Sequence, residues 1–520
     1  MRKIITTAND SKDSLYVLIK SLSKSEKRQF KLYVGRLDGN ADSKYLQLFN
    51  LLDKMNAYEE TEIFKNNIVK KQQLSNLKAH LYKQILISLR LSPAHQNIRV
   101  QIREQLDFAT VLYQKGLYQQ SLKLLEKAKH MAIDNEEKNV AYEIVELEKV
   151  IETQYITRSM STRAEELAKE AEDLSVQNLM TSKLSNLSLQ LYGIMLKTGY
   201  VRSDDEKREI TTYFNDAMPN YNLSTLGFRE KLWLYKAYLW YSFLIQDFVS
   251  CFKYATRFVE LFEENPSMIS RNPVFFLKGN HYLLESLFYL KHHTKFKEVL
   301  DGLENRLETE DFPRSDNLEI LEFLYVYSHK LNLKFMVGDF TTDDGLINTI
   351  EKYLKQSRQR MDEHHIMVFY YKIASLYFGS GQNKKCIEYL GRIINNKSLK
   401  MREDLMCFAR ILNLVAHYEA GMDYHLETLL KSTFKFLIKM DDLHEVQKEM
   451  IKFLRNLGEV FPGEIKNEFK KLRERLEVYE EDPYERRAFL YLDILSWLDS
   501  RIQNRPVAEI IKEKAQVLNR

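Results

Sequence analysis

Glycine and proline are scarce in this sequence of 520 residues, which contains 16 glycines and 8 prolines. An average protein of this length has roughly twice as many glycines and three times as many prolines. Sheets and barrels need many tight turns, and such turns depend on both residue types. The composition therefore excludes an all-β fold and argues against a doubly wound α/β fold.

Cysteine and long apolar runs are also rare. The three cysteines, Cys251, Cys386 and Cys407, form no C-x-x-C pair, so we expect neither a disulfide framework nor a structural zinc site. No stretch of about 18 apolar residues is present, as a membrane span would require. The first residues contain no apolar segment typical of a secretory signal. We therefore expect a cytoplasmic protein that does not insert into a membrane.

The motifs of common catalytic and cofactor sites are missing as well. The sequence contains no G-x-x-x-x-G-K-[ST] phosphate loop, no G-x-G-x-x-G, no G-x-S-x-G and no H-E-x-x-H. Two pairs of adjacent histidines, His292 with His293 and His364 with His365, point to different faces of a helix and cannot share a metal as an i, i+4 pair would. We expect a protein that is not an enzyme and has no cofactor or metal.

The residues that are present indicate an ordered helical protein. Hydrophobic residues make up 44% of the chain and aromatic residues 12%, more than a disordered chain contains. The prolines lie in segments typical of breaks between helices, such as residues 264–273, and not within an apolar helical pattern. The predicted fold class is all-α.

One spacing pattern recurs around Gly116 and Gly381. A small residue lies seven positions before each glycine and another lies five positions after it, while large residues lie at −4 and +9. These residues are Ala109, Leu112, Ser121 and Leu125 around Gly116, and Ala374, Tyr377, Cys386 and Leu390 around Gly381. The small residues let two antiparallel helices approach each other, and the glycine permits the left-handed backbone that ends the first helix.

This pattern resembles that of the tetratricopeptide repeat (TPR) family. In length and style the chain is also similar to divergent bacterial repeat proteins without an assigned activity. The resemblance implies an α-solenoid of antiparallel helix hairpins. Weaker matches place further joints near Ser159, Gly199, Gln246, Thr294, Gly338 and Gly421. The resulting period is about 43 residues, longer than the roughly 34 residues of the family.

The two ends lack joints of this type. The predicted organisation is a basic helical N-terminal module over 1–104, TPR-like repeats over 105–440 and C-terminal capping helices over 441–520. A solenoid must cover its last apolar face. The candidates for this cover are Phe489, Leu490, Leu492, Leu495 and Trp497. The alternative is that these aromatic and aliphatic residues form an exposed patch that recruits a partner.

Positive charge is concentrated in residues 1–104, which contain 19 Lys and Arg against 10 Asp and Glu. Five of these basic residues share one face of a predicted helix: Lys20, Lys24, Lys27, Arg28 and Lys31. A solvated helix surface is the simpler interpretation. The alternative is a surface that binds the phosphates of a nucleic acid.

Two other groups also have two interpretations. Segment 233–243 contains Trp233, Tyr235, Tyr238, Trp240, Tyr241 and Phe243. A helix of this composition is either buried between its neighbours or lines a groove for a peptide. Asn413 and His417 precede the joint at Gly421 and either have a core or surface role or line a concave, partner-binding face.

The sequence thus predicts a non-enzymatic scaffold that binds a peptide or a partner protein on a superhelical surface, as the resemblance implies. The alternative is a regulator whose basic N-terminal module contacts nucleic acid or a nucleic-acid-associated complex. The candidate partner-binding residues are Lys20, Lys24, Lys27, Arg28, Lys31, Asn413 and His417.

Overall fold

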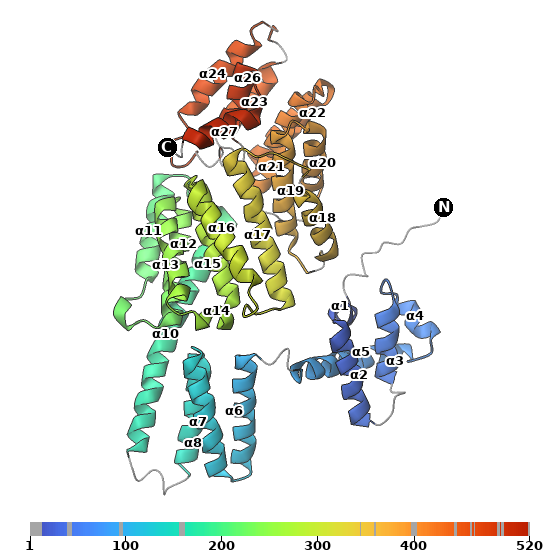
Figure 1. Ribbon diagram of the computed structural model, residues 1–520, viewed down its shortest axis with the longest axis vertical. Coiled ribbons are helices and arrows are strands. Elements are labelled where there is room, and N and C mark those ends of the chain that lie inside the picture. Colours follow the sequence, from blue (N-terminus) through green and yellow to red (C-terminus); the bar gives the residue numbers. More distant parts are fainter. Residues whose placement is uncertain are drawn as a thin grey trace. The chain divides into compact units, whose positions relative to one another are not determined.

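The computed structural model describes residues 13–38, 44–92, 97–154, 162–343, 345–357, 360–396, 403–440, 445–457, 460–461, 463–485, 489 and 493–517. Every regular element in these ranges is a helix, and they contain no strand (Figure 1). The predicted all-α class is therefore confirmed. No helix of the described ranges combines the length and the apolar character needed to span a membrane. The chain divides into two compact units, Met1–Leu174 and Ser175–Arg520.

The first unit contains two hydrophobic cores. The first core is built by α1 (Ser14–Ser21), α2 (Lys24–Asp38), α3 (Lys44–Lys54), α4 (Glu60–Lys65) and α5 (Lys71–Arg90). Phe30 and Phe49 are fully buried there, with ring centres 4.7 Å apart. The second core is built by α6 (Ile98–Gln114), α7 (Tyr118–Asp134), α8 (Lys138–Glu152) and the first part of α10 (Arg163–Thr198).

The second unit begins within α10 and continues as successive packed helices. These are α11 (Asp204–Ala217), the 3-10 helix η2 (Leu223–Thr225), α12 (Phe228–Leu244), α13 (Phe248–Glu263), α14 (Ser267–Arg271), α15 (Pro273–Tyr289), α16 (His293–Glu308), α17 (Asp316–Val337), α18 (Leu346–Ser357), α19 (Glu363–Gly379), α20 (Asn383–Ile394), α21 (Glu403–Glu419), α22 (Asp423–Met440), α23 (Glu445–Asn456), α24 (Ile465–Glu477), α26 (Ile494–Gln503) and α27 (Val507–Val517). Helix α12 packs on α13, α13 on α15, α15 on α16 and α17, α17 on α19, α19 on α20 and α20 on α21.

Short polar side chains cap the start of many of these helices. The oxygen of Ser315 accepts a hydrogen bond from the backbone N–H of Leu318 at the start of α17. Such caps pair the backbone donors that the first helical turn leaves free. The same type of contact is made by Asp13, Asn97, Ser203, Asp247, Asp362 and Asp493.

Residues with a left-handed backbone lie between the paired helices. Gly116 and Gly381 both have φ 75°, as the sequence pattern predicts, and the following residue closes the helix end with a backbone hydrogen bond of 2.9 Å to the carbonyl five residues earlier. The predicted joints at Gly199, Gln246, Gly338 and Gly421 also have positive φ, whereas the joint predicted near Thr294 lies three residues earlier, at Lys291. Ser159 lies outside the described residues.

The small residues of the pattern face each other across the hairpin of α6 and α7. The Ser121 hydroxyl donates a 2.7 Å hydrogen bond to the backbone carbonyl of Ala109, and both residues are fully buried. Cys251 and Cys386 occupy the position of Ser121 in their own hairpins and are also fully buried. Burial raises the pKa of both thiols, so these cysteines act as packing residues.

Candidate functional site

The second unit contains a cavity of about 1860 Å³. Its lining comes from α10, α12, α15, α17 and α19, and from the later helices α24, α26 and α27. Helices α12, α15 and α19 each stand first in a hairpin whose second helix is α13, α16 or α20. Side chains from the first helices of several hairpins therefore line a single cavity.

Helix α12 shows why the aromatic segment at 233–243 allows two interpretations. Leu232, Leu234 and Leu239 are buried in hydrophobic cores. Trp233 and Trp240, on another face of the same helix, line the cavity. The helix is thus both a packed core element and a cavity wall, and the binding of a peptide to that wall stays a prediction.

Aromatic rings form much of the cavity lining. The Trp240 ring centre lies 4.8 Å from that of Tyr192 on α10 and 5.6 Å from that of Tyr282 on α15. Trp233 meets Phe275 edge to face at 5.4 Å. Aromatic side chains with fixed neighbours offer large contact area at low entropic cost, which suits them to binding.

The lysines that line the same cavity include Lys236 of α12, Lys278 of α15 and Lys372 of α19. Burial lowers the pKa of Lys236 to about 8, and the neighbouring charge of Lys278 contributes. Burial lowers the pKa of Lys278 as well. The Lys236 ammonium lies 4.6 Å from the centre of the Trp233 ring, so a cation–π contact partly replaces its hydration.

Lys372 is held by polar groups of α17. Its ammonium donates hydrogen bonds to the Ser328 hydroxyl at 2.6 Å and to Asn332 Oδ1 at 2.8 Å. Burial lowers its pKa to about 8, while the carboxylate of Glu285 acts in the opposite direction. The lysine is therefore positioned by its neighbours but incompletely compensated in charge.

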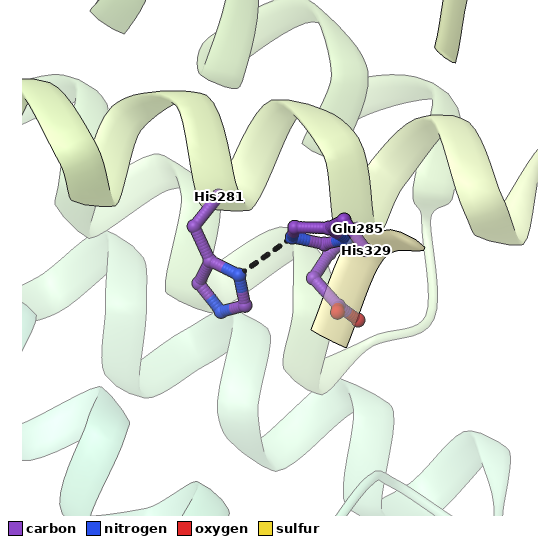
Figure 2. Close-up of side chains that lie close together, drawn as sticks. All are labelled: His281, Glu285 and His329. Carbon is purple, nitrogen blue, oxygen red and sulfur yellow. Dashed lines mark hydrogen bonds between the residues drawn. The ribbon is translucent and has the colours of Figure 1, made fainter. Parts of the chain in front are cut away.

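Two histidines and a carboxylate form a compact group beside Lys372. His281 and Glu285 lie four residues apart on α15, and His329 lies on α17 (Figure 2). One ligand atom of each lies within 4.8 Å of those of the other two. The Nδ1 of His281 and the Nε2 of His329 share a hydrogen bond of 2.9 Å.

Both imidazoles are neutral at pH 7. Burial lowers the pKa of His281 to about 3, with further contributions from Lys372, His365 and Lys278. Burial also holds the pKa of His329 well below its ordinary value. A neutral imidazole has one nitrogen that accepts a hydrogen bond or binds a metal.

The basic residues predicted to bind a partner lie in the first unit, on α1 and α2. The Lys20 ammonium donates a 2.7 Å hydrogen bond to the carbonyl of Asp53, and Lys27 forms a 2.7 Å ion pair with the Asp53 carboxylate. Lys31 lies 5.7 Å from the ring centre of Phe49. Lys24 and Arg28 are both exposed. Several members of this face therefore stabilise the module itself.

Asn413 and His417 are buried on α21, at 7% and 9% exposure. The Nδ1 of His417 shares a 2.7 Å hydrogen bond with the backbone carbonyl of Asn413. Neither residue belongs to the cavity lining. Their surroundings match the core role that the sequence left open.

The predicted capping residues Leu495 and Trp497 are buried on α26, at 2% and 1% exposure. The Trp497 indole donates a 2.7 Å hydrogen bond to the carboxylate of Glu419 on α21. Phe489 and Leu495 also line the cavity. Leu490 and Leu492 lie outside the described residues.

Comparison with known proteins gives no relative. No protein-family model, no curated protein and no solved structure matches this chain.

Proposed function

We propose that this protein is a non-enzymatic interaction protein that binds an acidic, extended segment of a partner protein in the cavity of its second unit. The observation that carries the proposal is the set of three lysines, Lys236, Lys278 and Lys372, that line one cavity among aromatic rings. Within this proposal, the helix hairpins form a TPR-like solenoid, and the cavity is its inner surface.

The spacing of the joints supports the solenoid. From Gln246 onward, the left-handed residues at the predicted joints, together with Lys291, are Gln246, Lys291, Gly338, Gly381 and Gly421, and they are spaced at intervals of 45, 47, 43 and 40 residues. A near-constant interval means that each hairpin adds the same kind of unit to its neighbour. The first helices of the units then contribute side chains to one surface, as α12 does with Lys236 and α15 with Lys278.

The lysines on α12, α15 and α19 support an acidic ligand at their side of the lining, whereas most of the carboxylates of the lining belong to residues 480–513. Desolvation of an ammonium group costs free energy, and a carboxylate brought beside it recovers part of that cost. The carboxylate of Glu285 raises the pKa of Lys372 and so partly offsets the effect of burial. The pKa of Lys278 is lowered by burial. An acidic group placed near Lys278 and Lys236 would compensate two charges at once.

The size of the cavity supports a polypeptide segment. Sites for small ligands usually measure about 300–1,000 Å³, and this cavity measures about 1860 Å³. Aromatic rings such as Trp240 and Tyr282 suit apolar side chains that alternate with acidic ones along an extended strand.

A library of random peptides displayed on phage tests the proposal with the purified full chain. The expected outcome is enrichment of peptides rich in Asp and Glu with at least one large apolar residue. The selected peptide, measured by fluorescence anisotropy, should bind at least tenfold more weakly to Lys236→Ala and Lys278→Ala. Lys297→Ala removes an exposed lysine of α16 in the same unit and should bind as the unchanged protein does.

Two results would contradict this function. One is a library that yields no acidic enrichment. The other is a selected peptide whose affinity is unaffected by both cavity lysines. Each variant must keep the helical circular dichroism of the unchanged chain, so that lost binding is not confused with lost folding.

The nucleic-acid alternative for residues 1–104 stays a prediction. Lys20 and Lys27 both contact Asp53, and these contacts favour a structural role for this part of the basic face. A steep fall of duplex affinity with salt would support the alternative.

A further inference from the structure

We propose that His281, Glu285 and His329 form a binding site for a divalent transition-metal ion such as Zn²⁺. The proposal goes beyond the peptide function and does not depend on it. The geometry that carries it is the convergence of two nitrogen ligands and one oxygen ligand from two packed helices in the cavity wall (Figure 2).

Helix geometry brings the first two ligands together. Residues four positions apart lie on the same face of a helix, so the imidazole of His281 and the carboxylate of Glu285 project in the same direction from α15. Helix α17 packs on α15 and supplies His329. The three ligand atoms then lie within 4.8 Å of one another.

The two nitrogens are already close to the separation that a metal imposes. Tetrahedral zinc binds imidazole at about 2.0–2.1 Å, which places two such nitrogens about 3.3 Å apart. The nitrogens of His281 and His329 lie 2.9 Å apart across their shared hydrogen bond. A widening of about 0.4 Å would let an ion replace the proton between them.

The ligand set suits a borderline cation. Imidazole favours zinc and the neighbouring transition metals, and a single carboxylate completes the two-histidine, one-carboxylate set of many such sites. Three protein ligands leave a fourth position open. His281 and Glu285 line the cavity, so water or a ligand carboxylate can reach that position.

The surroundings provide a partner for the second nitrogen of His329. Asn332 Nδ2 lies 3.5 Å from His329 Nδ1, and Asn332 Oδ1 accepts a hydrogen bond from Lys372. When a metal binds Nε2, Nδ1 must carry the proton. Rotation of the Asn332 amide would turn its oxygen toward that proton, while Lys372 keeps its bond to Ser328. Asn332 is therefore a positioning residue of the site.

Zinc titration of the purified, chelator-washed full chain without an affinity tag tests the proposal. Competition with a chromophoric chelator should give one tight site per chain. We expect His329→Ala and Glu285→Gln each to weaken it at least tenfold. His365→Ala removes another histidine of the same cavity and should leave the affinity unchanged. Asn332→Leu should weaken binding, whereas Asn332→Asp, which keeps an acceptor, should retain it.

A spectroscopic measurement avoids dependence on the folding of the variants. Cobalt bound to the unchanged chain should show the intense visible bands of a tetrahedral ion, and X-ray absorption of the zinc form should show two imidazole ligands. Absence of a tight site would overturn the proposal and leave the histidines as a hydrogen-bonded pair. An equal loss of zinc affinity in the His365→Ala variant would also overturn the proposal. Neither result would affect the peptide-binding test, which uses no metal.

Discussion

In the second core of the first unit, Lys129 Nζ lies 2.9 Å from Glu148 Oε2, and the two side chains are only 8% and 3% exposed. Lys129 also contacts Glu170 at 3.0 Å, and Glu148 contacts Arg163 at 3.1 Å. This network joins α7, α8 and α10. Its charges are buried, so each member depends on the others for compensation.

Replacement of Lys129 by Ala should destabilise the first unit by about 3 kcal/mol, because it leaves buried carboxylates with one cation fewer. Urea unfolding measures the loss, and faster amide exchange in α7 and α8 would locate it. Lys431→Ala breaks the ion pair with Glu427, whose side chains are 76% and 79% exposed, and should have no measurable effect. Equal behaviour of the two variants would contradict the role of the network.

Gly338→Ala should be more harmful than Gly116→Ala. Both glycines have a left-handed backbone, but a Cβ at Gly338 would lie 2.7 Å from the backbone nitrogen of Lys512 on α27, whereas at Gly116 nothing lies within 4 Å. The Gly116 variant should lose about 1 kcal/mol from backbone strain alone. The Gly338 variant should have a lower melting temperature than the Gly116 variant. It should also release α27, and limited proteolysis should then cleave the chain after α26. Equal melting temperatures would show that α27 does not pack there.

The stability of the second unit should fall as the pH drops below about 6.5. His281 has a folded pKa of about 3 and an ordinary value of 6.5, and the pKa of His329 is lowered in the same direction. The unfolded chain therefore binds protons that the native chain excludes. Stability is complete above the unfolded pKa and is lost toward the folded one, by up to about 1.4 kcal/mol per pH unit for each histidine.

Urea unfolding of the unchanged chain between pH 7 and pH 5 measures this slope. The double variant His281→Asn, His329→Asn should show a flatter dependence over the same range. Lys372, His365 and Lys278, which act on His281, remain in both proteins. If the pH dependence of the free energy of unfolding is the same in the double variant as in the unchanged chain, His281 and His329 do not cause it.

Lys372→Met should stabilise the protein while it weakens binding in the cavity. The folded pKa of Lys372 is about 8, against an ordinary value of 10.5, so at pH 7 burial of the charged form opposes folding. Methionine keeps the length without the charge, and we expect a gain of about 1–2 kcal/mol after the hydrogen bonds to Ser328 and Asn332 are lost. The gain should vanish above pH 10.5, where the unfolded lysine is also neutral. A lower melting temperature at pH 7 would contradict this account.

Local features of the fold were predictable from the sequence. A glycine with small residues at −7 and +5 fixes a helix end and a close hairpin, so Gly116 and its partners Ala109 and Ser121 could be placed from spacing alone. The joint near Thr294 was displaced by three residues, because Lys291 adopts the left-handed backbone without being a glycine. Residue type gave no signal there.

The candidate site was not predictable in the same way. His281 and His329 are 48 residues apart, and only the packing of α15 on α17 brings them together. The one local signal was the i, i+4 spacing of His281 and Glu285. This pair contains a single histidine, because the second histidine of the site lies on another helix. Likewise, Asp53 on another helix forms an ion pair with Lys27. The sequence alone therefore overstates how many charges of the basic face are available to a partner.

The position of α27 has a consequence for synthesis on the ribosome. Helices α12 to α19 emerge before α27, which packs on α17 and is made only after the whole stretch between Gly379 and Val507. At ordinary elongation rates that delay is on the order of ten seconds. During it the cavity lacks the part of its lining that α27 contributes, so we expect the apolar lining of the other helices to be open to chaperones until α27 docks.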